Sequence, residues 1–363
     1  MLNNRKAFML VVLVCFLVLA ACDKNNANEH TSGTISEGNG GAPAYTVIAK
    51  DLKIPWSIAF DNGDIYMSER EGSIVKVDAT GKLTRESVKL HKPLHVEGEG
   101  GLLGVVLTPD FKSSSKAFAY HTYKENDQVL NRIVVLKQTK GGWVEDKSLL
   151  EGIPGYQYHN GGRLAIGPDG KLYATTGDSG VEERAQQLDS LAGKILRLNL
   201  DGSVPADNPF PDSYVYSYGH RNPQGIAWNA QGVMYSTEHG PSGDPGGHDE
   251  INLIVPGGNY GWPDIIGDEK KEGMISPIYQ TGETALAPSG MAIDDEGRIW
   301  FAALRGEGLY RFDPATGKID KVLDGVGRLR DVQIHNGKMY VITNNTDGRG
   351  TPGKDDDRLL LLG

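Results

Sequence analysis

Cysteine is almost absent from this sequence, which has two cysteines in 363 residues, Cys15 and Cys22. Both lie in the N-terminal segment, so the rest of the chain can form no disulfide and offers no cysteine nucleophile. A domain without disulfides must be held together by an ordinary hydrophobic core, and about 320 residues are enough to build one.

Positive charge is also scarce. The chain has 37 Lys and Arg residues against 47 Asp and Glu residues, which gives a formal net charge of −10, and no basic stretch interrupts it. Such a charge argues against nucleic acid and against anionic membrane surfaces as partners. Any contact with a membrane is therefore expected only through the N-terminal segment.

The N-terminal segment has the pattern of an export signal. Two basic residues precede an uncharged apolar run, residues 7–21, which is shorter than the roughly 20 residues that a membrane-spanning helix needs. The run ends in Leu-Ala-Ala-Cys22, which resembles the bacterial lipobox. We therefore expect residues 1–21 to be a lipoprotein signal peptide, and we expect a lipid on Cys22 to anchor the exported protein on a bacterial membrane surface. An ordinary cleaved signal peptide is the alternative.

The segment after the lipobox looks like a tether. Residues 22–44 begin with the lipidated cysteine and continue as a polar, glycine-rich stretch without hydrophobic periodicity. Such a composition cannot bury enough apolar surface to fold, so it favours a flexible linker. The folded domain is then expected to span residues 45–363.

From residue 45 onward helical periodicity is nearly absent, and a short strand motif recurs instead. A turn glycine is followed by one residue and then by a hydrophobic–aromatic pair, and a second alternating strand comes after each copy. A weaker copy at residues 115–120 lacks the glycine and brings the number of units to six. The full copies are Gly63-Asp-Ile-Tyr66, Gly170-Lys-Leu-Tyr173, Gly232-Val-Met-Tyr235, Gly297-Arg-Ile-Trp300 and Gly337-Lys-Met-Tyr340.

Repeats of about 40–65 residues that contain only strands and turns are typical of a β-propeller. We therefore predict an all-β fold for residues 45–363, a six-bladed β-propeller whose active site lies on the central axis. A β-sandwich is the rival fold, but a sandwich does not need the same hairpin six times. Residues 46–52 are expected to supply the outer strand that closes the ring with the last blade.

Two sequence blocks combine a cation, polar side chains and a tight glycine–proline loop, which suits a binding site better than a core. They are Gly219-His-Arg-Asn-Pro-Gln-Gly225 and Gly257-Gly-Asn-Tyr-Gly-Trp-Pro263. A third stretch, Gly162-Arg-Leu-Ala-Ile-Gly-Pro-Asp169, follows His159. In this order, the blocks resemble the glucose/sorbosone dehydrogenase family, soluble quinoproteins that use pyrroloquinoline quinone (PQQ) and calcium. The resemblance runs from about residue 52 to the C-terminus.

The resemblance implies catalytic roles for two residues. His159 would accept the proton of the anomeric hydroxyl, a task that suits an imidazole at neutral pH. Arg221, together with Asn222, would contact the quinone carbonyls and stabilise the negative charge that builds there. Without the resemblance, a histidine beside glycines is more often structural, and an arginine in a turn is more often salt-bridged.

The resemblance also implies further cofactor contacts. PQQ carries three carboxylates, so its site should gather cations, and the matching positions here are Arg305, Arg328 and Arg330, with Arg305 standing where relatives have Lys. Glu99 stands where relatives often carry Gln. A carboxylate next to an anionic quinone is repelled unless calcium or an arginine intervenes. The alternative for these arginines is a set of solvated loop residues.

Calcium binds six to eight hard oxygen atoms, many of them backbone carbonyls. Gly240 and Pro241 resemble the family loop whose two carbonyls hold the ion that also contacts PQQ. Glu250 and the carbonyl of Tyr260 resemble a second, structural calcium site. The acidic stretch 354–358 is interpreted as a solvated loop.

Two other patterns point to different chemistry. Gly177-Asp-Ser-Gly180 echoes a serine protease sequence, but it ends a predicted strand and is interpreted as a turn. His159, His220 and His239 are a conceivable transition-metal set, yet no two of them have the short spacing typical of metal ligands.

The resemblance therefore implies an enzyme that oxidises aldose sugars at C1 to the lactone with PQQ, and that passes the electrons to an external acceptor. A first alternative is a calcium-dependent sugar lactonase on a six-bladed propeller, which has no use for the arginine cluster. A second alternative is a non-enzymatic propeller that binds carbohydrate or protein, in which His159 has no catalytic role.

Overall fold

The computed structural model describes residues 35–36, 44–241, 243 and 246–363. The predicted signal peptide, Cys22 and almost all of the predicted tether lie outside these residues, so the lipid anchor stays a prediction. Within the described part of the chain, no helix is both long enough and apolar enough to cross a membrane.

Nearly all regular structure is β-sheet, and the first eight strands after residue 50 form one sheet. They are β3 (Pro55–Asp61), β4 (Asp64–Glu69), β5 (Ser73–Val77), β6 (Leu83–Lys89), β7 (Leu102–Leu107), β8 (Lys116–Glu125), β9 (Gln128–Thr139) and β10 (Gly142–Pro154). The strand order is β3-β4-β5-β6-β10-β9-β8-β7. Strand pairing joins its two four-stranded halves where β6 runs parallel to β10, with Val88 opposite Trp143 and Lys89 opposite Val144.

Three sheets of four consecutive antiparallel strands follow. The first contains β11 (Leu164–Ile166), β12 (Leu172–Thr176), β13 (Lys194–Leu198) and β14 (Val215–Tyr218). The second contains β15 (Pro223–Trp228), β16 (Met234–Glu238), β17 (Glu250–Ile254) and β18 (Tyr279–Gln280). The third contains β19 (Pro288–Ile293), β20 (Ile299–Ala303), β21 (Gly308–Asp313) and β22 (Lys318–Leu323).

The last sheet joins the two ends of the described chain. It has the order β1 (Ile35–Ser36), β2 (Tyr45–Ala49), β25 (Leu359–Leu362), β24 (Lys338–Thr343) and β23 (Leu329–His335). Strand β2 pairs antiparallel with β25, with Val47 opposite Leu360. The strand expected within residues 46–52 therefore exists and pairs with the last strand. The helical segments among the described residues are α1 (Phe111–Ser114) and the 3-10 turn η1 (Glu182–Gln186).

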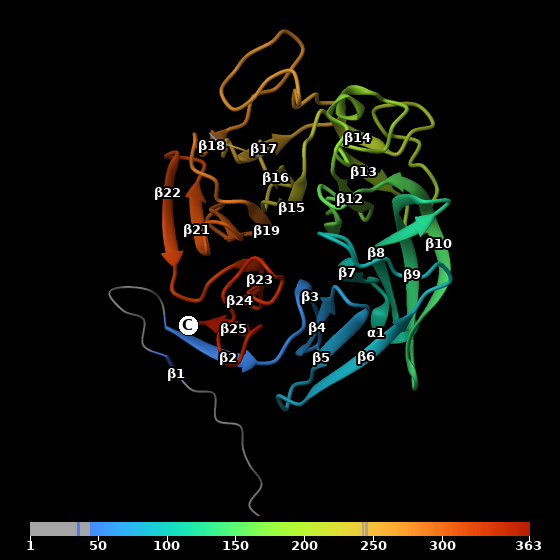
Figure 1. Ribbon diagram of the computed structural model, residues 1–363, viewed down its shortest axis with the longest axis vertical. Helices are drawn as coiled ribbons and strands as arrows, with labels where there is room; N and C mark the ends of the chain where they lie inside the picture. Colours follow the sequence, from blue (N-terminus) through green and yellow to red (C-terminus); the bar gives the residue numbers. More distant parts are fainter. Residues whose placement is uncertain (1–34, 37–43, 242, 244–245) are drawn as a thin grey trace, which may run out of the picture. The chain divides into compact units, whose positions relative to one another are not determined.

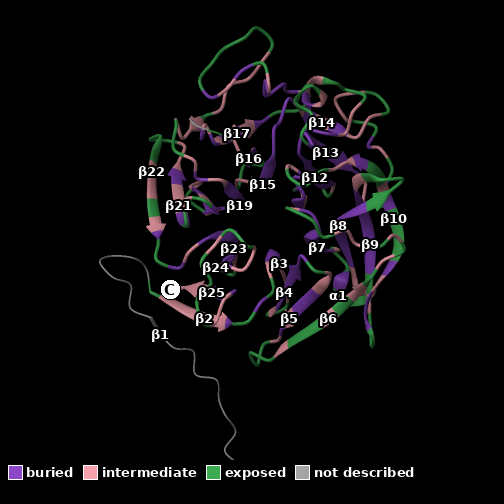
Figure 2. Cartoon of the chain, in the orientation of Figure 1, coloured by how far each residue is buried: buried purple, intermediate pink, exposed green. Residues whose placement is uncertain are grey.

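Within residues 45–363 the sheets follow one another around a common centre, from β3 in blue to β25 in red (Figure 1). The first strand of each four-stranded group contacts the first strand of the next, in the cycle β3–β7–β11–β15–β19–β23–β3. These inner strands are mostly buried, whereas outer strands such as β6 and β22 are largely exposed or half-buried (Figure 2). The inner strands therefore bring residues from distant parts of the sequence to one place.

The hydrophobic core lies between neighbouring sheets. One cluster packs Phe118 and Tyr120 of β8 against Leu172 of β12 and Leu196 of β13. The repeat glycines explain the hairpins, because Gly170 adopts a φ of +72° and meets no neighbouring atom within 4 Å. Glycine is required there by the backbone conformation of the turn, not by crowding.

A buried ion pair connects four of the sheets at the centre. Arg163 Nη1 lies 3.0 Å from Asp331 Oδ2, and both side chains are almost fully buried. Arg163 Nε also donates to the carbonyl of Gln224 in β15 at 2.8 Å. Asp331 accepts the backbone N–H of Ile58 in β3 at 2.9 Å, and the Arg163 guanidinium lies 4.2 Å from the ring centre of Trp56. The pair thus ties the strands β3, β15 and β23 to the segment that enters β11.

Gly290 in β19 gives a test of this central packing. A Cβ at Gly290 would lie 1.8 Å from Asp331 Oδ1, so Gly290→Ala must displace Asp331 from its partners. We expect the free energy of unfolding to fall by about 3 kcal/mol or more, measured by chemical denaturation. Gly141→Ala is the control, because its nearest atom would be 3.9 Å away, and it should change the unfolding free energy by less than about 0.5 kcal/mol. Equal effects of the two substitutions would contradict the account.

Candidate active site

Loops from several sheets enclose a cavity of about 540 Å³, a size within the roughly 300–1,000 Å³ of small-molecule sites. Many residues singled out in the sequence lie together on its wall. They are Glu99, His159, Arg221, Gly240, Pro241, Arg305 and Arg328.

His159 forms a pair with an acid that the sequence did not identify as part of a site. His159 Nδ1 lies 2.8 Å from Asp178 Oδ1. Asp178 also accepts the backbone N–H of Gly180 at 2.9 Å and the indole Nε1–H of Trp262 at 2.9 Å. Since Asp178 acts as the acceptor in all of these bonds, we assign the proton of His159 to Nδ1, which leaves Nε2 as an acceptor.

Close backbone packing fixes the loop that carries His159. A Cβ at Gly177 would lie 2.0 Å from the carbonyl oxygen of His159, and one at Gly161 would lie 2.5 Å from that of Thr175. His159 itself has a φ of +58°. The loop therefore lies directly on the end of β12, which holds the imidazole next to Asp178.

Arg221 and Asn222 occupy different places. Arg221 is buried in the cavity wall with its guanidinium 5.2 Å from the ring centre of Trp262, and burial lowers its pKa. Asn222 is not among the described residues that line the cavity. Its Oδ1 accepts the backbone N–H of Gly161 at 3.0 Å. Asn222 thus supports the His159 loop from behind.

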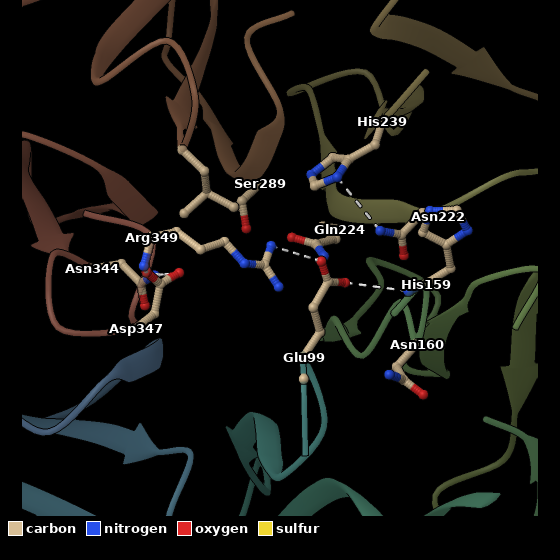
Figure 3. A network of polar contacts seen from close by, with 12 residues as sticks. Glu99, His159, Asn160, Asn222, Gln224, His239, Ser289, Asn344, Asp347 and Arg349 are labelled. Atoms are coloured by element: carbon tan, nitrogen blue, oxygen red, sulfur yellow. Dashed lines mark hydrogen bonds and ion pairs between the residues drawn. The ribbon is translucent and has the colours of Figure 1, made fainter. Parts of the chain in front are cut away.

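The structure places an arginine beside Glu99. Arg349 Nη1 lies 2.9 Å from Glu99 Oε1, and Glu99 Oε2 accepts the backbone N–H of His159 at 3.2 Å (Figure 3). Burial alone would raise the pKa of Glu99, but the Arg349 guanidinium, supported by His239, lowers it to about 2. Glu99 is therefore anionic at neutral pH and is neutralised by a cation from the C-terminal loop.

The other predicted cations differ in their exposure. Arg328 is buried in the cavity wall and pairs with Asp347 at 3.0 Å. Arg305 lines the cavity with an exposed side chain. Arg330 is not among the described lining residues; its Nη1 donates to Gln224 Oε1 at 2.8 Å, and burial lowers its pKa to about 9. Arg330 is thus a buried cation of the central packing.

The predicted calcium residues lie together. Gly240 and Pro241 line the main cavity and also a second cavity of about 10 Å³, whose wall includes Glu250 and Tyr260. That volume is about that of one water molecule. Burial raises the pKa of Glu250 to about 8, and the negative charge of Glu238 adds to the effect. Glu250 and Glu238 therefore lie close together in the wall of the second cavity.

Backbone oxygens also gather at this position. A Cβ at Gly240 would lie 2.1 Å from the carbonyl oxygen of Gly247 and 2.3 Å from that of His248. In the described part of the chain, no group of three or more His, Cys, Asp or Glu side chains is arranged to hold a metal. A cation here would depend on backbone carbonyls, which calcium accepts as ligands.

Asp178 and Arg349 are the residues that sequence reasoning missed. Asp178 lies in the segment 177–180, which forms a turn after β12 as expected, and Ser179 there donates to the carbonyl oxygen of Asp178 at 2.7 Å. The signal that marks Asp178 is its position: an acid two residues after the end of β12. Arg349 has no comparable local signal, because its partner Glu99 lies 250 residues away in the sequence.

Comparison with known proteins finds a family whose model matches most of this chain. The Glucose / Sorbosone dehydrogenase family model matches residues 52–360. Quinoprotein glucose dehydrogenase B of Acinetobacter calcoaceticus is 35% identical over 285 residues, which are 68% of this chain and 59% of that protein. Aldose sugar dehydrogenase YliI of Escherichia coli (strain K12) is 28% identical over 386 residues, covering 95% of this chain and 97% of that protein.

Solved structures agree with the sequence relatives. The PQQ-bound form of aldose sugar dehydrogenase from Streptomyces coelicolor superposes with a TM-score of 0.80 at 40% identity, over 87% of this chain and 96% of that chain. The mostly β fold predicted from the sequence is therefore confirmed, and it matches the fold of that enzyme.

The Glu99–Arg349 pair makes stability depend on pH. The pKa of Glu99 falls from an ordinary 4.5 to about 2 in the folded protein. Its contribution to stability is therefore present above about pH 4.5 and is lost as the pH falls toward 2. We expect Glu99→Gln to melt below the wild type at pH 6, and we expect the gap to shrink between pH 4.5 and pH 2. Thermal melts over this range, with Glu97→Gln as a surface-charge control, test this; a gap that does not change with pH would contradict it.

Proposed function

We propose, because this chain belongs to the glucose/sorbosone dehydrogenase family of PQQ-dependent sugar dehydrogenases, that it oxidises aldose sugars at C1 to the lactone and passes the electrons to an external acceptor. One observation carries the proposal: the His159–Asp178 pair and several arginines line the same cavity. PQQ and calcium are the proposed cofactors.

We infer that the sheets form the six blades of a propeller. Support comes from the eight-stranded sheet, whose halves share only two parallel residue pairs and so count as two blades. The cycle of contacts among β3, β7, β11, β15, β19 and β23 supports one inner strand for each blade. The cavity would then lie where the loops of these blades meet.

The first chemical task, removal of the anomeric hydroxyl proton, falls to His159. Its Nδ1 is occupied by Asp178 at 2.8 Å, so Nε2 is the atom that accepts the proton. Asp178 keeps the ring in this tautomer and stabilises the imidazolium that forms. Glu99 and Asn222 hold the backbone of the same loop at 3.2 Å and 3.0 Å. When bound, PQQ would accept the two electrons and the C1 hydrogen of the sugar.

The wall of the cavity fits an anionic, hydrogen-bonding ligand such as PQQ. Arg328 Nε and His239 Nε2 are buried there and have no hydrogen-bond partner within the described part of the chain. Buried polar atoms are normally satisfied, and a ligand in the cavity would supply partners for these two. Arg221, Arg305 and Arg328 would hold its carboxylates and carbonyls, and the buried charge of Arg221 would stabilise negative charge developing on it.

Calcium would find hard oxygen donors at both cavities. The carbonyls of Gly240 and Pro241 would hold the ion that contacts PQQ, and the carboxylate of Glu250 with the carbonyl of Tyr260 would hold the structural ion. Its positive charge would also relieve the repulsion between Glu250 and Glu238. The lactonase alternative gives no role to the arginines of the main cavity, and we therefore prefer the dehydrogenase.

A dye-reduction assay tests the proposed function. Purified protein is incubated with PQQ and calcium and then given glucose and an artificial electron acceptor. We expect dye reduction that needs PQQ and that is lost when EGTA removes calcium before PQQ is added. His159→Ala should lower kcat by about 10²- to 10⁴-fold, the usual contribution of a general base. His91→Ala is the control, because the side chain of His91 is 66% exposed and does not line the cavity.

The opposite results are equally clear. If the His159→Ala variant is as active as the wild type, His159 is not the base that accepts the proton. A wild type that reduces no dye with a panel of aldoses, and that binds no PQQ, would overturn the dehydrogenase proposal and make lactone hydrolysis the next activity to measure.

A further inference from the structure

Arg349 belongs to the cavity wall but was not predicted as a cofactor contact. It lies in the loop between β24 and β25 and lines the cavity together with Glu99 and Arg328. Its side chain is 49% exposed, whereas that of Glu99 is 18% exposed. Arg349 therefore stands where a ligand that enters the cavity would meet it.

The backbone of Arg349 is anchored to Asp347 of the same loop and, through Asp347, to Arg328. The N–H of Arg349 donates to Asp347 Oδ1 at 2.9 Å. The other carboxylate oxygen of Asp347 accepts Arg328 Nη2 at 3.0 Å and Asn344 Nδ2 at 2.7 Å. The loop is thus held in place, and only the long side chain of Arg349 reaches to Glu99 (Figure 3).

The guanidinium of Arg349 keeps most of its hydrogen-bonding capacity. It has five N–H donors, and the contact seen within the described residues uses Nη1, to Glu99 Oε1. Arg330, by contrast, is fully buried and bonded to Gln224 and Ser289. An exposed guanidinium with unused donors suits bidentate binding of a carboxylate.

We propose that Arg349 is a carboxylate-binding residue of this cavity, held ready by Glu99 and shared with the ligand when the ligand binds. The inference rests on the proposed function. Two carboxylate sources share this chemistry: one of the three carboxylates of PQQ, or the carboxylate of an acidic aldose such as glucuronate.

The proposal makes opposite predictions for the two partners of the ion pair. Removing Arg349 takes away a ligand contact, whereas removing the charge of Glu99 frees Arg349 and takes away a repulsive anion. If the pair had only a structural role, either substitution would break the same bond at 2.9 Å and both would shift ligand affinity in the same direction. The sign of the two effects therefore separates binding from structural support.

The experiment titrates the calcium-loaded protein with PQQ and measures Kd from the quenching of tryptophan fluorescence. We expect Arg349→Met to raise Kd by about 10- to 100-fold, the range for loss of a charged hydrogen bond. Arg349→Lys should recover part of the affinity, and Glu99→Gln should lower Kd. Arg298→Ala is the matched control: Arg298 pairs with Asp294 and Glu296 and does not line the cavity, so Kd should not change.

A second arm identifies the source of the carboxylate. At saturating PQQ, kcat/KM is compared for glucose and glucuronate in the wild type and in Arg349→Met. If Arg349→Met raises the Kd for PQQ, the cofactor is the source of the carboxylate. If the Kd for PQQ is unchanged and kcat/KM falls for glucuronate but not for glucose, the acidic substrate is the source of the carboxylate.

Two results would overturn the inference. In the first, Arg349→Met changes neither the Kd for PQQ nor kcat/KM for glucuronate. In the second, Glu99→Gln and Arg349→Met weaken PQQ binding equally. Melting temperatures are recorded for every variant, and Arg349→Lys serves if Arg349→Met does not fold. A wild type that neither binds PQQ nor oxidises an aldose would instead contradict the proposed function, so the two failures are distinguishable.

Discussion

The buried ion pair between Arg163 and Asp331 holds the inner strands together at the centre of the domain. It joins strands from four sheets through contacts of 2.8–3.0 Å, and removal of one partner from such a pair typically costs about 3–5 kcal/mol. The active-site residues lie beside it in the sequence. His159 precedes Arg163 by four residues, and Arg328 and Arg330 precede Asp331 by three residues and one. The same contacts that hold the centre together therefore help to position His159, the proposed base, and Arg328, one of the cations of the cavity.

Three acids of the cavity wall have their hydrogen-bond and ion-pair partners within the protein. Asp178 is engaged by His159, Glu99 is engaged by Arg349, and Asp249 accepts backbone N–H groups of Gly240, Leu286 and Ala287. These carboxylates are satisfied by the protein itself. Arg328 Nε has no partner within the described part of the chain, and the exposed guanidinium of Arg349 contacts only Glu99 there, so a protein with a net charge of −10 offers a site suited to an anionic ligand.

The sequence was informative where structure is local. The repeat glycines with positive φ and the alternating strands predicted an all-β fold, and the two strands of each motif form the middle strands of a sheet, as β12 and β13 do. The site residues were predicted from the family resemblance, and four of them line one cavity: His159, Arg221, Arg305 and Arg328. It did not separate lining residues from supporting ones, as Asn222 and Arg330 show. Arg349 escaped notice because its partner Glu99 lies 250 residues away in the sequence. Asp178 escaped notice because its role depends on the packing of its turn against the His159 loop, 19 residues earlier.

A single-turnover titration shows whether bound PQQ takes the electrons from the sugar. Protein loaded with calcium and one equivalent of PQQ, without any electron acceptor, receives glucose while the absorption of the oxidised quinone is followed. We expect this absorption to disappear and one lactone to form per bound PQQ, because oxidation of C1 removes two electrons. Lactone formed without loss of the quinone absorption, or no lactone from protein that binds PQQ, would contradict the proposed function.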